Sequence, residues 1–186
     1  NILHRLLTEK NVTHTGHYFQ FEDLTIEPTS IQIPNIPIWI GARWTDKIAE
    51  GALRRCGMYG NTFIFPADTP KSFYLEIKKK VKQYAETAGR DPDKIEWAGT
   101  LWTCLGPTKD QALATANQEI SRILKIPWEV DPTRSYGLGT SQDCIDTIEE
   151  FRDLGITNMM ITPCWPIEES TAQMEQFAAE VIPHFA

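Results

Sequence analysis

Short apolar runs alternate with amphipathic segments along most of this chain. Residues 36–40 (Ile-Pro-Ile-Trp-Ile) form a continuous apolar run, as expected of a strand that is buried on both faces of a parallel sheet. Further strands are predicted at 62–65, at about 95–105 and at 156–162. Because each strand is followed by a helical pattern, the order implies a parallel sheet with right-handed crossovers.

The segments between these strands carry apolar residues at helical spacing and recognisable helix starts. Thr69 and Pro70 place a hydroxyl at an N-cap and a proline at the first helical position. Thr108 begins a pattern typical of a capping box, and Ser141 is placed to cap a later helix. Helices are therefore predicted over about 45–58, 69–89, 108–124, 141–155 and 168–182.

The first 33 residues follow a different pattern. The chain opens with Asn1 and runs directly into apolar residues at helical spacing, so we expect it to continue a helix of a longer protein. Residues 12–33 mix aromatic, Thr and charged positions, with turns at Gly16 and Pro28. They predict a small hairpin or an irregular excursion. The whole chain, 1–186, is interpreted as a single domain in which this segment precedes four β/α units at 34–186.

Composition and charge narrow the function classes. The net charge of −7 and the pI near 5.1 argue against a nucleic-acid or anionic-membrane partner. No apolar run approaches the roughly 20 residues of a membrane span. The four cysteines lie far apart and favour neither a zinc site nor a disulfide framework, so a reducing cytoplasm is expected. His14 and His17 have no third ligand in their pattern, and no metal site is predicted.

Several segments, in order, resemble luciferase-like monooxygenases. Residues 34–41 (Pro-Asn-Ile-Pro-Ile-Trp-Ile-Gly) are similar to the family's fifth strand, and residues 12–24 to the excursion before it. Further similar segments are 52–55, 69–70, 88–92, 139–141 and 154–156. Two departures are Gly41-Ala42, where many members carry Gly-Gly, and Gly60-Asn61-Thr62, where they carry Asp-Gly-Trp.

The resemblance implies an α/β fold, the (β/α)₈ TIM barrel. A barrel of this kind typically needs about 250 residues. Four β/α units would be its C-terminal half, strands five to eight, with the N-terminal half missing. From the pattern alone, a free-standing doubly wound sheet remains an alternative.

The implied activity is that of an oxidoreductase using reduced FMN or coenzyme F420. It would act on a small organic substrate by monooxygenation or by hydride transfer. In the family, the first half of the barrel supplies the catalytic His or acid, so no catalytic residue is assigned here. A homodimer, or association with the missing N-terminal half, is the expected assembly. The alternatives are a non-catalytic flavin-binding protein, an inactive half-barrel fragment, and a phosphate-sugar barrel enzyme of another family.

The turn after the strand at 36–40 is the first candidate site, because barrel enzymes bind ligands at the C-terminal ends of strands. Gly41 lets backbone N–H groups approach a phosphate, and the next helix offers its positive end. Arg43 can add a charge-assisted contact, and Thr45 a hydroxyl. The resemblance implies that Gly41, Ala42, Arg43 and Thr45 contact the phosphate or ribityl part of the cofactor.

Other strand ends carry further candidates. Phe65 and Pro66 end the second strand and are candidate cofactor contacts, with filling of the barrel interior as the favoured alternative for Phe65. Trp102 is a candidate for lining a substrate pocket, with core packing as the favoured alternative. Cys164 is interpreted as structural, because nothing near it in sequence lowers a thiol pKa. The glycines in 137–139 lack a dinucleotide fingerprint and predict a mobile loop.

Overall fold

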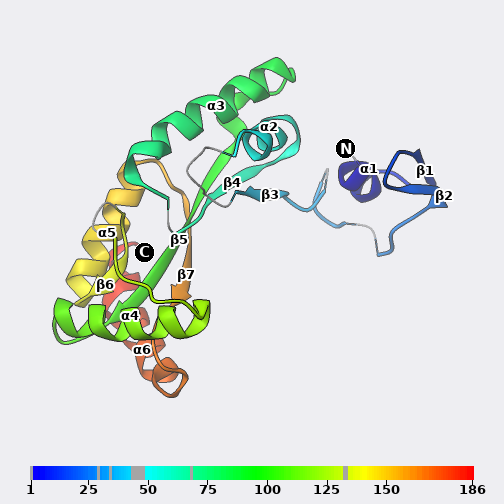
Figure 1. Cartoon of the computed structure of the whole chain (residues 1–186). Coiled ribbons are helices and arrows are strands. Elements are labelled where there is room, and N and C mark those ends of the chain that lie inside the picture. The colour runs from blue at the N-terminus through cyan, green and yellow to red at the C-terminus, as the bar shows by residue number, and fades with distance from the viewer. Residues whose placement is uncertain (1, 29, 34, 43–48, 68, 132–133) are drawn as a thin grey trace.

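A five-stranded parallel sheet forms the centre of the part of the chain that the structure describes (Figure 1). The structure is a computed structural model and describes residues 2–28, 30–33, 35–42, 49–67, 69–131 and 134–186. The strands of the sheet are β3 (Trp39–Gly41), β4 (Thr62–Phe65), β5 (Glu96–Leu105), β6 (Gly137–Gly139) and β7 (Asn158–Pro163).

The long strand β5 organises the sheet. Its first part pairs with β4, which in turn pairs with β3. Thr103, near the other end of β5, lies opposite Gly137 of β6 and opposite Pro163 of β7. Since Gly99 is likewise shared between β4 and β7, β6 extends the side of β5 that β4 occupies. In the described structure, β3 and β7 are therefore the two outer strands.

Helices cover one face of the sheet and build the larger core. Figure 1 shows α3 and α5 on the same side of β5. Fully or nearly fully buried side chains from the helices and strands meet in this core, among them Leu53, Phe63, Ile77, Leu101 and Phe151. The main helices are α2 (Glu50–Tyr59), α3 (Tyr74–Thr87), α4 (Lys109–Leu124), α5 (Ser141–Asp153) and α6 (Ser170–Gln176). Short 3₁₀ turns occupy Lys71–Phe73, Pro92–Lys94, Ile167–Glu169 and Ile182–His184, and a π-helical turn occupies Phe177–Val181.

The opposite face of the sheet is more open. Side chains alternate between faces along a strand, so Leu101 and Leu105 enter the larger core whereas Trp102 and Cys104 point the other way. There, α4 packs against β5 and β6 and forms a smaller cluster with Cys104. Toward the sheet edges the same face is left exposed, with Trp39 at 45% and Met160 at 49% of their accessible area.

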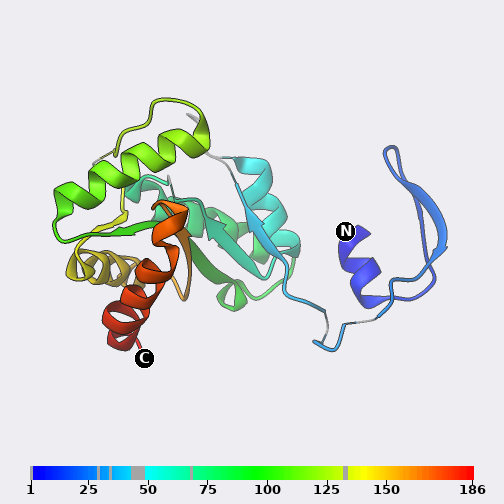
Figure 2. The same cartoon turned by 90° about the horizontal axis from the view of Figure 1, so that it is seen from below.

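The N-terminal segment consists of α1 (Ile2–Thr8) and an antiparallel hairpin of β1 (Val12–Thr15) and β2 (Gln20–Leu24). Both views show this segment to one side of the sheet (Figures 1 and 2). The hairpin predicted for residues 12–33 is therefore present, restricted to its first half.

The predicted order of strands and helices is confirmed, with corrections at several boundaries. The apolar run at 36–40 was expected to form a strand buried on both faces, but the strand is only Trp39–Gly41 and lies at an edge. A strand extends only where a partner lies beside it, and β4 pairs with these three residues alone. The helix expected at 45–58 begins, among the described residues, at Glu50.

Two expected helix caps are wrong and one is confirmed. The Thr69 hydroxyl donates to the Pro66 carbonyl at 2.7 Å instead of capping α3. Thr140, not Ser141, caps α5. Thr108 caps α4 by accepting the Gln111 N–H at 3.3 Å.

The predicted loop at 137–139 is wrong, since it forms β6. Close packing favours glycine at position 137, because an added Cβ would lie 3.0 Å from the side chains of both Cys144 and Leu101.

Two further properties bear on function. Among the described residues, no helix is long and apolar enough to cross a membrane. The same residues hold no group of three or more His, Cys, Asp or Glu side chains arranged to bind a metal ion.

Candidate functional site

The carboxyl ends of the strands define the candidate site. Because all pairings in the sheet are parallel, the residues that follow each strand gather along one edge. From β3 to β7 they are Ala42, Pro66, Gly106, Thr140 and Cys164. This edge brings together the candidate residues that the sequence places after separate strands.

The end of β3 presents bare backbone. Gly41 is exposed, and an added Cβ would lie 3.0 Å from the Ile64 side chain on the neighbouring strand. Ala42 follows at 8% exposure and packs into the larger core. The candidate residues Arg43 and Thr45 lie outside the described residues. The described part of this turn thus exposes the Gly41 backbone beside the Ile64 side chain.

At the end of β4, the Phe65 side chain does not take the position expected for a contact with the cofactor. The Phe65 side chain is fully buried and stacks on Tyr74 of α3, with ring centroids 4.3 Å apart. It therefore belongs to the helix-covered core, and its ring does not face the open side of the sheet. Pro66 is partly buried, and its carbonyl accepts the Thr69 N–H at 3.0 Å as well as the Thr69 hydroxyl. A ligand at this strand end would therefore contact backbone and Pro66, and not the Phe65 ring.

Trp102 lies on the opposite face from Phe65 and is partly exposed. Its ring packs against two other partly exposed aromatic side chains, with centroids 5.1 Å from Trp128 and 6.1 Å from Tyr136. Trp128 and Tyr136 in turn meet edge-to-face at 5.8 Å. We call Trp102, Trp128 and Tyr136 the aromatic cluster. The sequence indicated Trp102 alone, because Trp102 lies near the end of a predicted strand. Trp128 and Tyr136 lie between α4 and β6, outside any predicted strand or helix.

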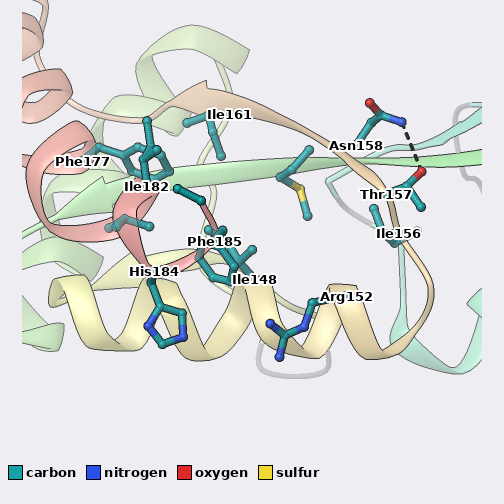
Figure 3. Close-up of a pocket in the computed structure, with 13 residues that line it drawn as sticks. Ile148, Arg152, Ile156, Thr157, Asn158, Ile161, Phe177, Ile182, His184 and Phe185 are labelled. Carbon is teal, nitrogen blue, oxygen red and sulfur yellow. Dashed lines mark hydrogen bonds between the residues drawn. The ribbon is translucent and has the colours of Figure 1, made fainter.

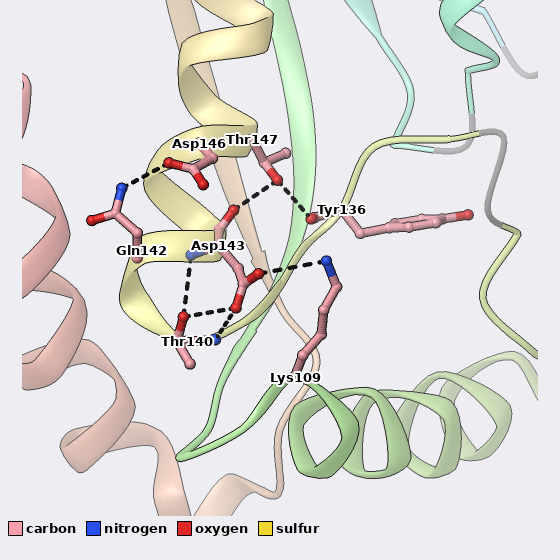
Figure 4. Close-up of polar contacts among 7 residues, drawn as sticks. All are labelled: Lys109, Tyr136, Thr140, Gln142, Asp143, Asp146 and Thr147. Carbon is pink, nitrogen blue, oxygen red and sulfur yellow. Dashed lines mark hydrogen bonds and ion pairs between the residues drawn. The ribbon is translucent and has the colours of Figure 1, made fainter.

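The start of α5 is a complete capping box (Figure 4). The Asp143 carboxylate accepts the Thr140 N–H at 2.9 Å and the Thr140 hydroxyl at 2.7 Å, and the Asp143 N–H contacts that hydroxyl oxygen at 3.3 Å. Lys109 of α4 approaches the same carboxylate at 3.5 Å. The hydrogen bonds from Thr140, with a smaller contribution from Lys109, hold the pKa of Asp143 below its usual value. The N-terminus of α5 is therefore already occupied by the Asp143 carboxylate.

The cysteines at this edge are unsuited to nucleophilic chemistry. Cys104 and Cys164 are each 1% exposed. Burial raises the pKa of Cys104 to about 11 and that of Cys164 to about 12. Both thiols are thus protonated at neutral pH, in keeping with the structural role expected for Cys164.

A separate hollow lies away from this edge. It has a volume of about 600 Å³ and sits between β7, α5 and the C-terminal turns (Figure 3). Ile148, Ile161 and Phe177 give it an apolar lining, and Thr157 and Asn158 place part of it at the amino end of β7. Because it opens on the helix-covered side of an outer strand, it is separate from the carboxyl edge that carries the candidate residues.

The chain belongs to the luciferase-like monooxygenase family, whose model matches residues 1–131. The resemblance seen in the sequence is thereby confirmed. Among curated proteins, none matches the chain significantly.

Solved structures show the same fold. The monooxygenase RslO1 from Streptomyces bottropensis is 18% identical with a TM-score of 0.75, over 99% of this chain and 59% of that one. The coenzyme F420 dependent tetrahydromethanopterin reductase from Methanopyrus kandleri is 23% identical with a TM-score of 0.72, over 100% of this chain and 61% of that one. An F420-dependent secondary alcohol dehydrogenase is 21% identical with a TM-score of 0.71, over 95% and 58%. The chain thus spans about three fifths of the length of these proteins.

Proposed function

We propose that this chain is the C-terminal half of a (β/α)₈-barrel oxidoreductase that uses FMN or coenzyme F420. The observation that carries the proposal is the carboxyl edge of the sheet, where the exposed Gly41 ends β3 beside an open sheet face. The family membership and the fold of the F420-dependent and monooxygenase structures support it. Each of the outer strands β3 and β7 pairs with a single neighbour in the described structure, and the remaining strands of a barrel would pair with their open sides.

The residues present fit a phosphorylated cofactor. Gly41 leaves backbone exposed at a strand end, as a phosphate contact needs. We assign the phosphate or ribityl region to Gly41, Ala42, Arg43 and Thr45. The backbone of Phe65 and Pro66 lies one strand further along the same edge, with the Phe65 ring holding that strand against α3.

The chain's own task is to bind and orient. The bound cofactor supplies hydride-transfer or oxygen chemistry. The larger core excludes water from one side of the sheet, and the residues assigned after β3 would hold the charged end of the cofactor. Trp102, on the open face, is assigned to the substrate side.

Catalytic proton transfer is assigned to residues outside this chain. None of the four histidines follows a strand of the sheet at its carboxyl end: three precede the sheet in sequence, at positions 4, 14 and 17, and His184 lies in the C-terminal 3₁₀ turn. We therefore propose that a second polypeptide, either the N-terminal half of the barrel or another copy of this chain, completes the catalytic site. The same observation favours a second candidate function, cofactor binding without turnover.

A comparison of FMN with riboflavin tests the phosphate assignment, because the two differ only in the phosphate. We expect the protein to bind FMN or F420, and to prefer FMN over riboflavin by about 10- to 150-fold if FMN is the cofactor, as for a charge-assisted contact worth about 1.5–3 kcal/mol. Arg43→Ala should abolish that preference or, for F420, weaken binding to a similar extent.

The matched control is Arg54→Ala, which removes the same charge from an exposed position on α2. It should leave cofactor affinity unchanged. Equal binding of phosphorylated and unphosphorylated flavin by the unaltered protein, with no uptake of F420, would overturn the assignment. Turnover of a substrate with NAD(P)H or reduced F420 then separates an oxidoreductase from a cofactor-binding protein.

A further inference from the structure

We propose that the aromatic cluster of Trp102, Trp128 and Tyr136 binds an aromatic ring of the substrate, so that the substrate class is planar and aromatic. The inference names the substrate class of the proposed function, and turnover of such a substrate depends on that function. Binding of the ring itself depends only on the cluster.

The cluster offers ring surface of two kinds. Trp102 and Tyr136 are nearly parallel, with an interplanar angle of 23°, whereas Trp128 meets them edge-on at 66° and 88°. All three residues are partly exposed. An arrangement of this kind presents both ring faces and ring edges to a fourth aromatic group.

The rings come from three segments that polar contacts hold in place. Trp102 is fixed within β5, which has neighbours on both sides. The Trp128 N–H donates to the Ser121 hydroxyl at 2.9 Å, which anchors the link after α4. The Thr147 hydroxyl of α5 donates to the Tyr136 carbonyl at 3.1 Å (Figure 4). Anchoring on α4 and α5 means that the cluster exists before a ligand arrives, which lowers the entropic cost of binding.

The position of the cluster also suits a substrate. Trp102 lies three residues before the carboxyl end of β5, on the face of the sheet away from the larger core. Its partly buried neighbours in the smaller cluster include Leu113 and Val130, which are apolar. The surroundings thus favour an uncharged ring over an ionic group.

An aromatic ligand gains more here than an aliphatic ligand of equal size. Stacked and edge-to-face ring pairs contribute about 0.5–1.5 kcal/mol beyond the burial of apolar area. A ligand that contacts the cluster should therefore prefer the aromatic form by about three- to tenfold. Burial of area alone would give no such preference.

The experiment compares naphthol with decalol, its fully saturated counterpart, by calorimetric titration of the complete chain. We expect naphthol to bind about three- to tenfold more tightly than decalol. Trp128→Leu should bring the ratio close to one, while Trp128→Phe, which keeps a ring, should retain most of it.

The matched control is Trp39→Leu, since Trp39 is a tryptophan exposed on the same face at the edge of the sheet. It should leave the ratio unchanged. Tyr136→Leu provides a second test if Trp128→Leu does not fold, as judged by circular dichroism. Equal affinity for the two probes, or an aromatic preference that survives both leucine variants, overturns the proposal. FMN uptake, followed separately by visible absorbance, reports on the proposed function and not on the cluster.

Discussion

The side-chain amide of Gln173 pairs with both backbone groups of Leu105. Its Oε1 accepts the Leu105 N–H at 2.9 Å, and its Nε2 donates to the Leu105 carbonyl at 2.7 Å. Both residues are nearly fully buried, at 8% and 3% exposure. The contact joins α6 to the last residue of β5, 68 positions earlier in the chain. It thereby fixes the C-terminal helix against the carboxyl edge of the sheet.

Gln173→Leu should lower the free energy of unfolding by about 2–4 kcal/mol, because it leaves two buried backbone groups without their partner. Urea denaturation followed by circular dichroism measures the change. Gln176→Leu, one turn later and nearer the surface, should cost no more than about 0.5–1 kcal/mol. Equal effects of the two substitutions would show that the bridge to Leu105 has no special weight.

The contact between α2 and α3 leaves no space for a side chain at Gly57. An added Cβ would lie 2.4 Å from the Tyr84 Cβ and 2.7 Å from the Val81 carbonyl oxygen. Gly57→Ala should therefore force the helices apart and destabilise the fold by about 1–3 kcal/mol or more.

Gly51 supplies the comparison within the same helix. Its added Cβ would meet only the flexible end of Arg55, at 3.4 Å. Gly51→Ala should stabilise the protein slightly, by up to about 1 kcal/mol, because alanine is the better helix former. Thermal denaturation of both variants measures the difference, and a change of the same sign in both would contradict this account of the helix contact.

The capping box at the start of α5 predicts a pH-dependent contribution to stability. Since hydrogen bonds from Thr140 lower the pKa of Asp143, the contribution is present above the usual Asp pKa and is lost as the pH falls through the lowered value. Asp143→Ala should cost about 1 kcal/mol near pH 7. The gap to the unaltered protein should narrow as the pH drops below about 4.

Asp146→Asn is the control for this helix, because Asp146 is exposed and bonds only Gln142 one turn away among the contacts resolved. It should leave the free energy of unfolding nearly unchanged at both pH values. A constant cost of Asp143→Ala across the acid range would mean that its carboxylate charge does not stabilise the helix start.

The four cysteines should react slowly with thiol reagents in the folded protein. All four are buried, and burial raises the pKa of Cys104 to about 11 and those of Cys56, Cys144 and Cys164 to about 12. Near pH 8, modification by an aromatic disulfide reagent should be about a hundredfold slower or more than in urea. One thiol that reacts as fast folded as unfolded would contradict the burial.

Sequence patterns predicted the interior of the sheet better than its edge. β4 was located to the residue, since Thr62–Phe65 stands between a turn and a proline and finds partners along its full length. The run at 36–40 has an equally strong pattern, yet β3 is limited by what β4 can pair with. Strand length at an edge is a tertiary property, and apolar content alone does not determine it.

Side-chain roles depended in the same way on contacts between distant segments. Thr140 and Ser141 are adjacent hydroxyl residues, and the geometry around Asp143 decides which one caps α5. Phe65 follows the alternation of its strand into the larger core, a direction the sequence leaves open. The aromatic cluster assembles from β5 and two parts of an irregular link, so that only Trp102 had a positional signal.

Native mass spectrometry of the purified protein, with its visible spectrum and a denatured intact mass, tests the central claim most directly. We expect the 21.2 kDa chain to appear with a second polypeptide or a second copy, and to carry or take up FMN or F420. A lone, colourless 21.2 kDa species that takes up neither cofactor on titration would contradict the assignment of a cofactor site to this chain.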